Sequence, residues 1–477
     1  MVRTMLKKND IIRIAITGIS SDGNGVGRCE GQAVFVPFTA VGDVIDARVV
    51  KIMRTYAYGI IEKLITPSGD RGETDCPHFG KCGGCCFRHI TYEAELRAKQ
   101  SFVEDALNRI GGLSVKVSQI VPSPDVDGYR NKVQFPVSER DGKLIPGFFY
   151  QRSHRIIDIA DSCLLQPGIM NSIAVYACDL MTAAGETAYD EISLKGNIRH
   201  LLLRRSSIDG SILLCVICRN GKIRGEDSFV SRLTAEFPDI RTVVINQNDK
   251  AGNGILTDRH RIIMGPGYIE DSICGVPAKL TYDSFFQINH ASTENLYRCV
   301  KECCDIKDGQ TVIDLYCGTG TIGLSSCDRS TRLFGIEVTP KAVESAREAA
   351  VEMGFDRAEF ICGDSGKVRE LVSRGIIADV VITDPPRKGC SAEVLEALVG
   401  SKAPKIVMVS CNPSTLARDL KHLCENGYTV ISVQPYDLFP RTKHVETVCC
   451  LYHQKKEFIS VPYEPRNADY LKKNKSE

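Results

Sequence analysis

The stretch TVIDLYCGTGTIGL, residues 311–324, decides the fold of the chain. Its first five residues are typical of a buried strand, the glycines that follow predict a tight turn, and a helix begins near Thr321. Glycines let the backbone approach a ligand closely, as in the turn after the first strand of nucleotide-binding α/β sheets. Such a loop also occurs for packing alone, so the neighbouring strands decide its interpretation.

Acidic residues follow the next strands of this region. RLFGIEV carries Glu337 near its end, FICGD ends at Asp364 and ADVVITD ends at Asp384. Because the carboxyl ends of parallel strands meet at one edge of a sheet, we expect these carboxylates to lie beside the glycine loop. The loop also resembles the GxGxxG dinucleotide motif, but the sequence offers no redox pocket. We therefore expect S-adenosylmethionine as the cofactor.

The sequence on either side of this region predicts further domains. Residues 1–65 alternate short strand-like runs with turns, which is typical of a small OB-like β-barrel. Residues 66–90 hold a cysteine-rich loop, and residues 113–280 form a β-rich central domain. From residue 281 to 458, strands and helices alternate as in a mainly parallel, Rossmann-like α/β sheet. An amphipathic helix is expected within 91–112.

Composition limits the kinds of partner. Lysine and arginine total 60 and aspartate and glutamate 59, so the net charge is +1 and any nucleic acid must be met by local basic patches. No run approaches the roughly 18 apolar residues of a membrane span, and the first residues lack a secretion signal. We expect a cytoplasmic protein with no membrane or obligate protein partner, and a disordered polar tail at 459–477.

Most of the 21 cysteines are expected to be small buried side chains. Cys215 and Cys218 form a CxxC pair inside an apolar run, where a core position is the better interpretation. Cys411 is different, because it follows the buried run 406–409 directly and so lies at a strand's carboxyl end. Asp384-Pro385-Pro386-Arg387 resembles the loop of amino-methyltransferases, but Arg387 replaces the aromatic residue that stacks on an amino base.

A ring carbon is therefore the more suitable methyl acceptor. Carbon 5 of a pyrimidine becomes nucleophilic only after carbon 6 is attacked, which a thiolate such as that of Cys411 can do. A base must then remove the proton from carbon 5, and Glu446 in HVETV is suited to that step. The sequence predicts a covalent cysteine mechanism.

Five motifs together resemble the bacterial RNA uracil-5-methyltransferase family: YDSFFQIN (282–289), DLYCGTGTIGL, DPPRKG, SCNPSTLARDL and HVETV. The resemblance implies a nucleophile, Cys411, and a base, Glu446, acting on a flipped-out uridine. It implies a cofactor and uracil pocket lined by Gln287, Tyr316, Thr321, Glu337, Asp364 and Asp384. Thr321 and Asp364 stand where related members often have Asn. The family also assigns the helix at 91–112 to the catalytic domain.

The cysteine-rich loop suggests a metal site. Cys76, Cys82 and Cys85 have C-x5-C-x2-C spacing, and Cys163 follows a later strand. Four thiolates suit an iron–sulfur cluster or, with tighter pairs, zinc, and the adjacent Cys86 is a further candidate. The resemblance implies a 4Fe–4S cluster, because the ribosomal branch of the family carries this pattern.

The resemblance also assigns the front of the chain to RNA. Residues 1–65 look like a TRAM domain, and together with the cysteines they favour 23S ribosomal RNA over tRNA. Tyr129, Arg130 and Lys132 are expected either to contact RNA or to lie on a solvated strand face. A tRNA methyltransferase of the same mechanism, an N-methyltransferase using the Asp384 loop and a non-catalytic iron–sulfur RNA-binding protein remain alternatives, and a folate-type carbon donor is not excluded.

Overall fold

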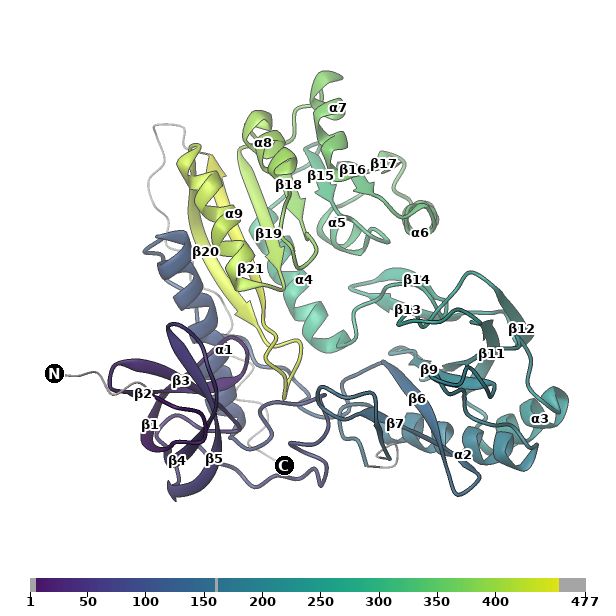
Figure 1. The fold of residues 1–477 in the computed structure, drawn as a ribbon. Coiled ribbons are helices and arrows are strands. Elements are labelled where there is room, and N and C mark those ends of the chain that lie inside the picture. Colours follow the sequence, from purple (N-terminus) through teal and green to yellow (C-terminus); the bar gives the residue numbers. More distant parts are fainter. Residues whose placement is uncertain (1–5, 159–161, 454–477) are drawn as a thin grey trace, which may run out of the picture.

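A computed structural model describes residues 6–158 and 162–453. Figure 1 shows a small barrel beside one long helix, a second β-rich part, and an α/β sheet above both. The predicted tail, 459–477, lies outside the described residues. Among the described residues, no helix is long and apolar enough to cross a membrane.

The N-terminal barrel is closed, with strand order β1-β2-β3-β5-β4. Side chains along its strands alternate between buried and exposed, as in strands that pack one face on a core. Two glycines, Gly25 and Gly27, face inward where a Cβ atom would meet a neighbour within 3 Å. The strands are β1 (Ile11–Ile19), β2 (Asn24–Cys29), β3 (Gln32–Pro37), β4 (Val44–Ile52) and β5 (Tyr56–Thr66).

The amphipathic helix is α1 (Tyr92–Ala106), extended by one π turn, η1 (Leu107–Gly111). Thr91 caps its start by accepting a hydrogen bond from the Ala94 amide at 3.3 Å. Val103 and Leu107 belong to the hydrophobic core on one face of the catalytic sheet. This contact is the packing that the family assignment of 91–112 implies, although the helix precedes the central domain in the chain.

The central domain is a seven-stranded sheet with order β12-β11-β10-β9-β6-β7-β8. One face is covered by α2 (Gly168–Ala183) and α3 (Glu226–Glu236), and the other packs partly on the catalytic domain. Cys215 and Cys218 are fully buried in β10, which confirms the prediction that they are core residues. The strands are β6 (Lys132–Arg140), β7 (Lys143–Phe149), β8 (Ile156–Asp158), β9 (Ile198–Arg205), β10 (Ile212–Cys218), β11 (Ile240–Gln247) and β12 (His260–Met264).

A hairpin, β13 (Ile269–Ile273) and β14 (Val276–Leu280), precedes the catalytic domain in the chain, and the helix α4 (His290–Cys304) follows the hairpin. The catalytic sheet has the order β17-β16-β15-β18-β19-β21-β20. The strands are β15 (Thr311–Leu315), β16 (Arg332–Glu337), β17 (Ala358–Cys362), β18 (Val380–Thr383), β19 (Lys405–Ser410), β20 (Tyr428–Tyr436) and β21 (Glu446–His453). The helices are α5 (Thr321–Ser326), α6 (Pro340–Glu352), α7 (Val368–Ser373), α8 (Ala392–Ser401) and α9 (Pro413–Glu425).

The topology of this sheet places the reactive edge. Strands β15 to β19 run parallel, and the order reverses direction between β15 and β18, where ligands bind in open α/β sheets. β21 runs antiparallel to β19. The first residue of β21 therefore lies at the same edge as the last residues of the parallel strands.

Candidate active site

A cavity of about 1160 Å³ lies at this edge, between the catalytic sheet and the central domain. Seven of the eight predicted catalytic and cofactor residues line it: Gln287, Tyr316, Thr321, Glu337, Asp384, Cys411 and Glu446. Asp364 is not among the lining residues. Its Oδ1 accepts a hydrogen bond from the Gly366 amide at 2.8 Å, so it stays a prediction without a contact to the cavity.

The glycine loop has the backbone that its sequence predicts. Gly318 and Gly320 have φ values of 54° and 78°, in the left-handed region that favours glycine. Gly320 directly precedes α5. A Cβ atom at this position would lie 3.1 Å from both Phe360 and Ala346, so a larger residue would be crowded. Glu337 holds the loop from β16, because its Oε2 accepts from the Gly318 amide at 3.2 Å and its Oε1 accepts from the Thr339 amide at 2.8 Å.

Asp314 supports the same loop and was not predicted as a site residue. It is buried at the end of β15, and its Oδ2 accepts from the Gly323 amide at 2.9 Å, while its Oδ1 has no partner among the described residues. Burial raises its pKa to about 8. The sequence does hold one indication of this role. Asp314 is an acidic residue inside the apolar strand TVIDL, and a buried carboxylate needs a hydrogen-bond partner.

A second unpredicted residue, Tyr297 on α4, joins two predicted ones. Its hydroxyl lies 3.2 Å from the Thr321 hydroxyl and also interacts with Gln287. All three residues line the cavity. Nothing in the spacing of α4 separates Tyr297 from the core residues around it, so this contact could not be found from the sequence.

Cys411 follows β19 directly and is half-buried. The next residue, Asn412, caps α9 by accepting from the Ser414 amide at 3.0 Å, and Pro413 occupies the first helical turn. The Asn412 amide also donates to the Arg387 carbonyl at 3.0 Å, which ties the cysteine turn to the loop after Asp384. Burial raises the pKa of Cys411 to about 11, helped by the charges of Glu446 and Asp384 and opposed by Arg387.

Two carboxyl groups face the thiol. Burial raises the pKa of Asp384 to about 6. Glu446, the first residue of β21, is 8% exposed, and burial followed by the charge of Asp384 raises its pKa well above the ordinary value. Glu446 is therefore a buried carboxyl group beside the thiol, an arrangement that suits exchange of a proton between a carboxyl group and a bound molecule.

Arg387 and His444 form the boundary of this cavity. The Arg387 guanidinium donates toward the His444 ring, with 3.3 Å to Nε2 and 3.4 Å to Nδ1. Burial and the nearby Arg387 charge lower the pKa of His444 to about 4, so the ring is neutral near pH 7 and can accept from the guanidinium.

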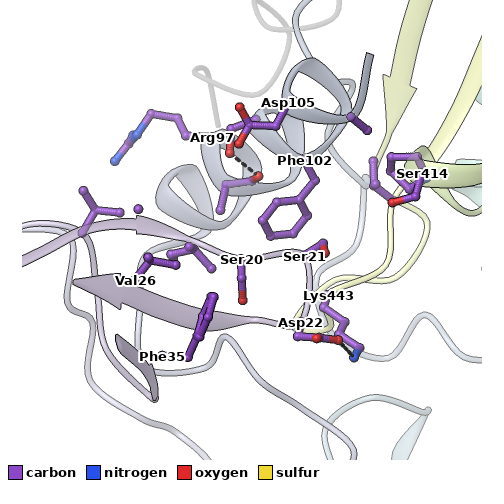
Figure 2. Close-up of a pocket in the computed structure, with 18 of the residues that line it drawn as sticks. Ser20, Ser21, Asp22, Val26, Phe35, Arg97, Phe102, Asp105, Ser414 and Lys443 are labelled. Carbon is purple, nitrogen blue, oxygen red and sulfur yellow. Dashed lines mark hydrogen bonds and ion pairs between the residues drawn. The ribbon is translucent and has the colours of Figure 1, made fainter. Parts of the chain in front are cut away.

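A second cavity of about 960 Å³ reaches Cys411 from the other side, between the barrel, α1 and the catalytic domain. Figure 2 shows Phe35 and Val26 of the barrel facing Arg97, Phe102 and Asp105 of α1 across it. We call this cavity the groove. Cys411, Arg387 and His444 line both the groove and the first cavity, so the thiol lies where the two meet.

The cysteine-rich loop does not form a recognisable metal site. Among residues 6–158 and 162–453, no group of three or more His, Cys, Asp or Glu is arranged so that it could hold a metal ion. The four predicted thiols lie near one another, however. The charges of Cys163 and Cys76 add to the burial that raises the pKa of Cys82, and the charge of Cys163 adds to the burial that raises the pKa of Cys85. Four thiols are suitable ligands for an iron–sulfur cluster, but in this structure they are not arranged as a ligand group.

The structure corrects the prediction for one of the three expected RNA contacts of the central segment, Tyr129. Tyr129 is 7% exposed, and its hydroxyl donates to the Pro440 carbonyl at 3.0 Å. It therefore packs between domains and lies on no solvated strand face. Arg130 is half-buried next to it, and Nε of its guanidinium has no partner among the described residues.

The sheet order, the glycine loop and the cavity beside it define a class I methyltransferase fold that uses S-adenosylmethionine. The chain belongs to the family of RNA uracil-5-methyltransferases that carry an N-terminal TRAM domain. It matches the family described as tRNA (Uracil-5-)-methyltransferase over residues 256–455 and the TRAM domain over residues 6–61. The predictions of the family, the fold class, the cofactor and an RNA substrate are thereby confirmed.

Full-length relatives support this assignment. A protein of Halalkalibacterium halodurans, named an uncharacterized RNA methyltransferase, is 38% identical over 448 residues, covering 94% of this chain and 98% of that protein. One of Clostridium tetani with the same kind of name is 37% identical, covering 95% and 99%. The crystal structure of Pyrococcus abyssi tRNA (uracil-54, C5)-methyltransferase with S-adenosyl-L-homocysteine is 26% identical, with a TM-score of 0.73 over 92% of this chain and 100% of that one.

Proposed function

We propose that this enzyme methylates carbon 5 of a uridine in 23S ribosomal RNA through a covalent adduct with Cys411. The observation that carries the proposal is the meeting of Cys411, Glu446 and Asp384 in the same cavity as the glycine loop. Three chain segments that lie far apart in the sequence supply these groups at one edge of the sheet. An N-methyltransferase or a non-catalytic RNA-binding protein would not need a thiol there.

The residues divide the reaction between them. Bound S-adenosylmethionine supplies an electrophilic methyl group. Cys411 loses its thiol proton to solvent, the thiolate Sγ bonds to carbon 6 of the uracil, and the electrons of the 5,6 double bond form an enolate. Carbon 5 of the enolate takes the methyl group, and S-adenosyl-L-homocysteine leaves. Glu446 then accepts the proton from carbon 5, the double bond re-forms, and the bond between carbon 6 and Sγ breaks. Burial raises the pKa of Glu446 above that of an ordinary carboxyl group, which makes its carboxylate a stronger base for this step.

Five residues are proposed to hold the cofactor: Gln287, Tyr316, Thr321, Glu337 and Asp384. Each oxygen of Glu337 already accepts one backbone amide, which leaves further lone pairs for ribose hydroxyls. This bonding fixes the direction of the carboxylate before the cofactor arrives.

RNA is proposed to reach Cys411 through the groove, with the target base flipped out of its stack. The groove has five basic residues and three acidic ones among its lining residues. Phe35 gives it an aromatic face from the barrel, a kind of surface on which unpaired bases stack. A flipped uridine from this side meets the thiol, while the cofactor approaches from the first cavity.

The 4Fe–4S cluster remains a proposal based on the four thiols. The closeness of the four thiols supports a cluster, whereas the absence of an arranged ligand group among the described residues argues against it. Iron and sulfide near four each in protein purified without oxygen would be the expected result. Stoichiometric zinc, or no metal, would contradict the cluster. Cys76→Ala and Cys163→Ala should then both lower the iron content, while Cys215→Ala serves as a buried control.

Ribosomal RNA and tRNA differ as substrates of the same reaction. The barrel does not separate them, since the structure of the archaeal tRNA enzyme is matched over its whole length. The cysteine loop favours ribosomal RNA only through the family pattern. Mapping 5-methyluridine in both RNA classes, in cells with and without the gene, decides between them. Loss from tRNA alone would reject the ribosomal assignment.

Two variants test the chemistry. Cys411→Ala should neither methylate RNA nor capture it covalently. Glu446→Gln keeps the nucleophile and the cofactor site but lacks the base, so a methylated protein–RNA adduct that resists denaturation should accumulate. Wild-type protein should form the same kind of adduct with 5-fluorouridine RNA, because fluorine cannot leave as a proton. Methylation by Cys411→Ala would reject the covalent route.

A further inference from the structure

The loop of residues 437–445, between β20 and β21, forms a wall of the first cavity, and we call it the strap. Phe439 and His444 of the strap line that cavity together with Cys411 and Glu446. Their rings meet edge to face, with centroids 5.9 Å apart and planes at 80°. His444 in turn contacts Arg387, so the strap sets the surface that a uridine on Cys411 would touch.

Five consecutive carbonyl groups of the strap are held by separate parts of the chain. The bonds are Ser292 Oγ to Asp437 O at 3.2 Å, Asn289 Nδ2 to Leu438 O at 3.0 Å, Lys99 Nζ to Phe439 O at 3.1 Å, Tyr129 OH to Pro440 O at 3.0 Å and the Cys86 amide to Arg441 O at 2.9 Å. A loop without regular secondary structure is thereby fixed at each of these peptides. Its conformation depends on helices α4 and α1, the central domain and the cysteine loop.

Lys99 is the charged member of this set. Its Nζ donates to Glu95 Oε1 at 2.6 Å and to Asp437 Oδ1 at 2.7 Å, and all three side chains are fully buried. Asp437 Oδ1 also accepts the Phe439 amide at 3.1 Å. Lys99 and Asp437 therefore hold both the amide and the carbonyl of Phe439, whose ring faces the cavity.

Burial of such a group is costly, and stability alone does not explain it. Moving an ammonium group and two carboxylates out of water costs several kcal/mol for each ion, and apolar residues of similar size often stabilise a fold equally well. A buried ion pair can instead fix one arrangement of the chain, because other arrangements leave its charges without partners. Here the ion pair fixes the backbone position of Phe439.

We propose that Lys99, with Glu95 and Asp437, is a positioning residue for the uridine-facing wall formed by Phe439 and His444. The proposal rests on the proposed covalent reaction at Cys411. Without Lys99, the strap moves and the uracil ring loses the wall that orients it against the thiol. The cofactor-binding part of the first cavity stays intact. Among the described hydrogen bonds, those of the Lys99, Glu95 and Asp437 side chains do not reach β15, β16 or the glycine loop.

The test is Lys99→Met, measured in the full-length protein. Capture of 5-fluorouridine RNA in the presence of S-adenosylmethionine is timed and divided by the fraction of protein that binds S-adenosyl-L-homocysteine. We expect capture to slow on the order of 10- to 100-fold, the effect of a displacement near 1 Å at a reacting centre. Affinity for S-adenosyl-L-homocysteine should stay within about twofold. Phe439→Ala should slow capture too, and the double variant should be no slower than the slower single one.

A matched control separates positioning from loss of a buried lysine. Lys405 on β19 is 7% exposed and donates from Nζ to the Cys304 carbonyl at 2.6 Å, away from the strap. Lys405→Met should lower stability while each cofactor-binding molecule captures RNA at the wild-type rate. Equal slowing by both lysine variants, or additive effects of Lys99→Met and Phe439→Ala, would overturn the proposal.

Two further results keep the test decisive. If Lys99→Met does not fold, Tyr92→Phe removes one bond to Asp437 at the far end of the same ion pair, where the hydroxyl donates to Oδ2 at 2.9 Å. It should slow capture about threefold with cofactor affinity unchanged, and unchanged capture would overturn the proposal. Wild-type protein that methylates RNA without capturing 5-fluorouridine RNA would instead reject the covalent reaction itself, and this proposal with it.

Discussion

At the scale of single residues, the reactivity of Cys411 depends on the charges around it. Burial and two carboxyl groups raise the pKa of the thiol, whereas Arg387 lowers it. Because a thiolate and not a thiol is the nucleophile, the fraction of Cys411 able to take part in the proposed attack near neutral pH depends on that balance. Arg387, which stands where amino-methyltransferases have an aromatic residue, thus favours the thiolate form of Cys411.

Arg387→Met should raise the pKa of Cys411 further and slow its alkylation by iodoacetamide at pH 7.5. Below the thiol pKa the thiolate fraction rises about tenfold per pH unit, so both proteins should react faster as the pH rises. The variant curve should lie to the alkaline side, and the difference should shrink once both thiols ionise. Lys388→Met, an exposed neighbour, is the control. Equal alkylation rates at pH 7.5, or a rate difference that persists once both thiols are ionised, would contradict the electrostatic role.

The cofactor carboxylates differ in how far the sequence revealed them. Glu337 was found because an acid at the end of the second strand is a known position for binding ribose. Asp314 was not found, because an acid within a strand has no such positional meaning. The Tyr297 contact to Thr321 also depends on how α4 packs, which spacing alone does not give.

At the scale of elements, β21 brings together the proposed base and the proposed nucleophile, which lie 35 positions apart in the chain. Its antiparallel pairing to β19 places Glu446 at the edge where Cys411 follows β19. The parallel strands β15 to β19 were predictable from short apolar runs that alternate with helices. The direction of β21 was not, since an apolar strand reads the same in either orientation.

The turn from β19 into α9 carries a testable contact. Asn412 both caps α9 and donates to the Arg387 carbonyl. Asn412→Ala should cost about 1 kcal/mol from the lost cap, and it should also slow methylation because the Asp384 loop is no longer tied to the cysteine turn. Asn412→Ser restores a cap but not the long amide. It should therefore recover the melting temperature and leave methylation slow. Recovery of both would mean that the cap alone matters.

At the scale of the whole molecule, the barrel and the catalytic domain share the groove. Lys443 of the strap reaches Asp22 of the barrel with Nζ to Oδ1 at 2.9 Å, and Figure 2 shows this contact at the rim. The sequence predicted both domains, but their contact involves residues more than 400 positions apart. A contact between residues so far apart in the chain cannot be predicted from local sequence patterns, because it depends on how the two domains pack.

The basic residues of the groove should set its affinity for RNA. Arg109 on the η1 turn pairs with Asp105 on α1 at 3.1 Å, and both side chains are mostly exposed. An exposed pair contributes about 0–1 kcal/mol, so a phosphate can displace the carboxylate at little cost. Arg109→Ala should weaken RNA binding and lower the slope of log K against log salt by about 0.7, the value for one phosphate of a single strand.

Asp105→Ala should act in the opposite direction and strengthen binding, because it removes the competing carboxylate and leaves Arg109 free. The matched control is Arg374 with Glu359, another exposed pair at 3.3 Å, which lies at the β17 edge of the catalytic sheet. Neither Arg374→Ala nor Glu359→Ala should change affinity or salt dependence. Both pairs are exposed and they differ in location. Opposite shifts at the first pair alone would therefore identify the groove as the path of the RNA, and equal shifts at both pairs would show only a general response to surface charge.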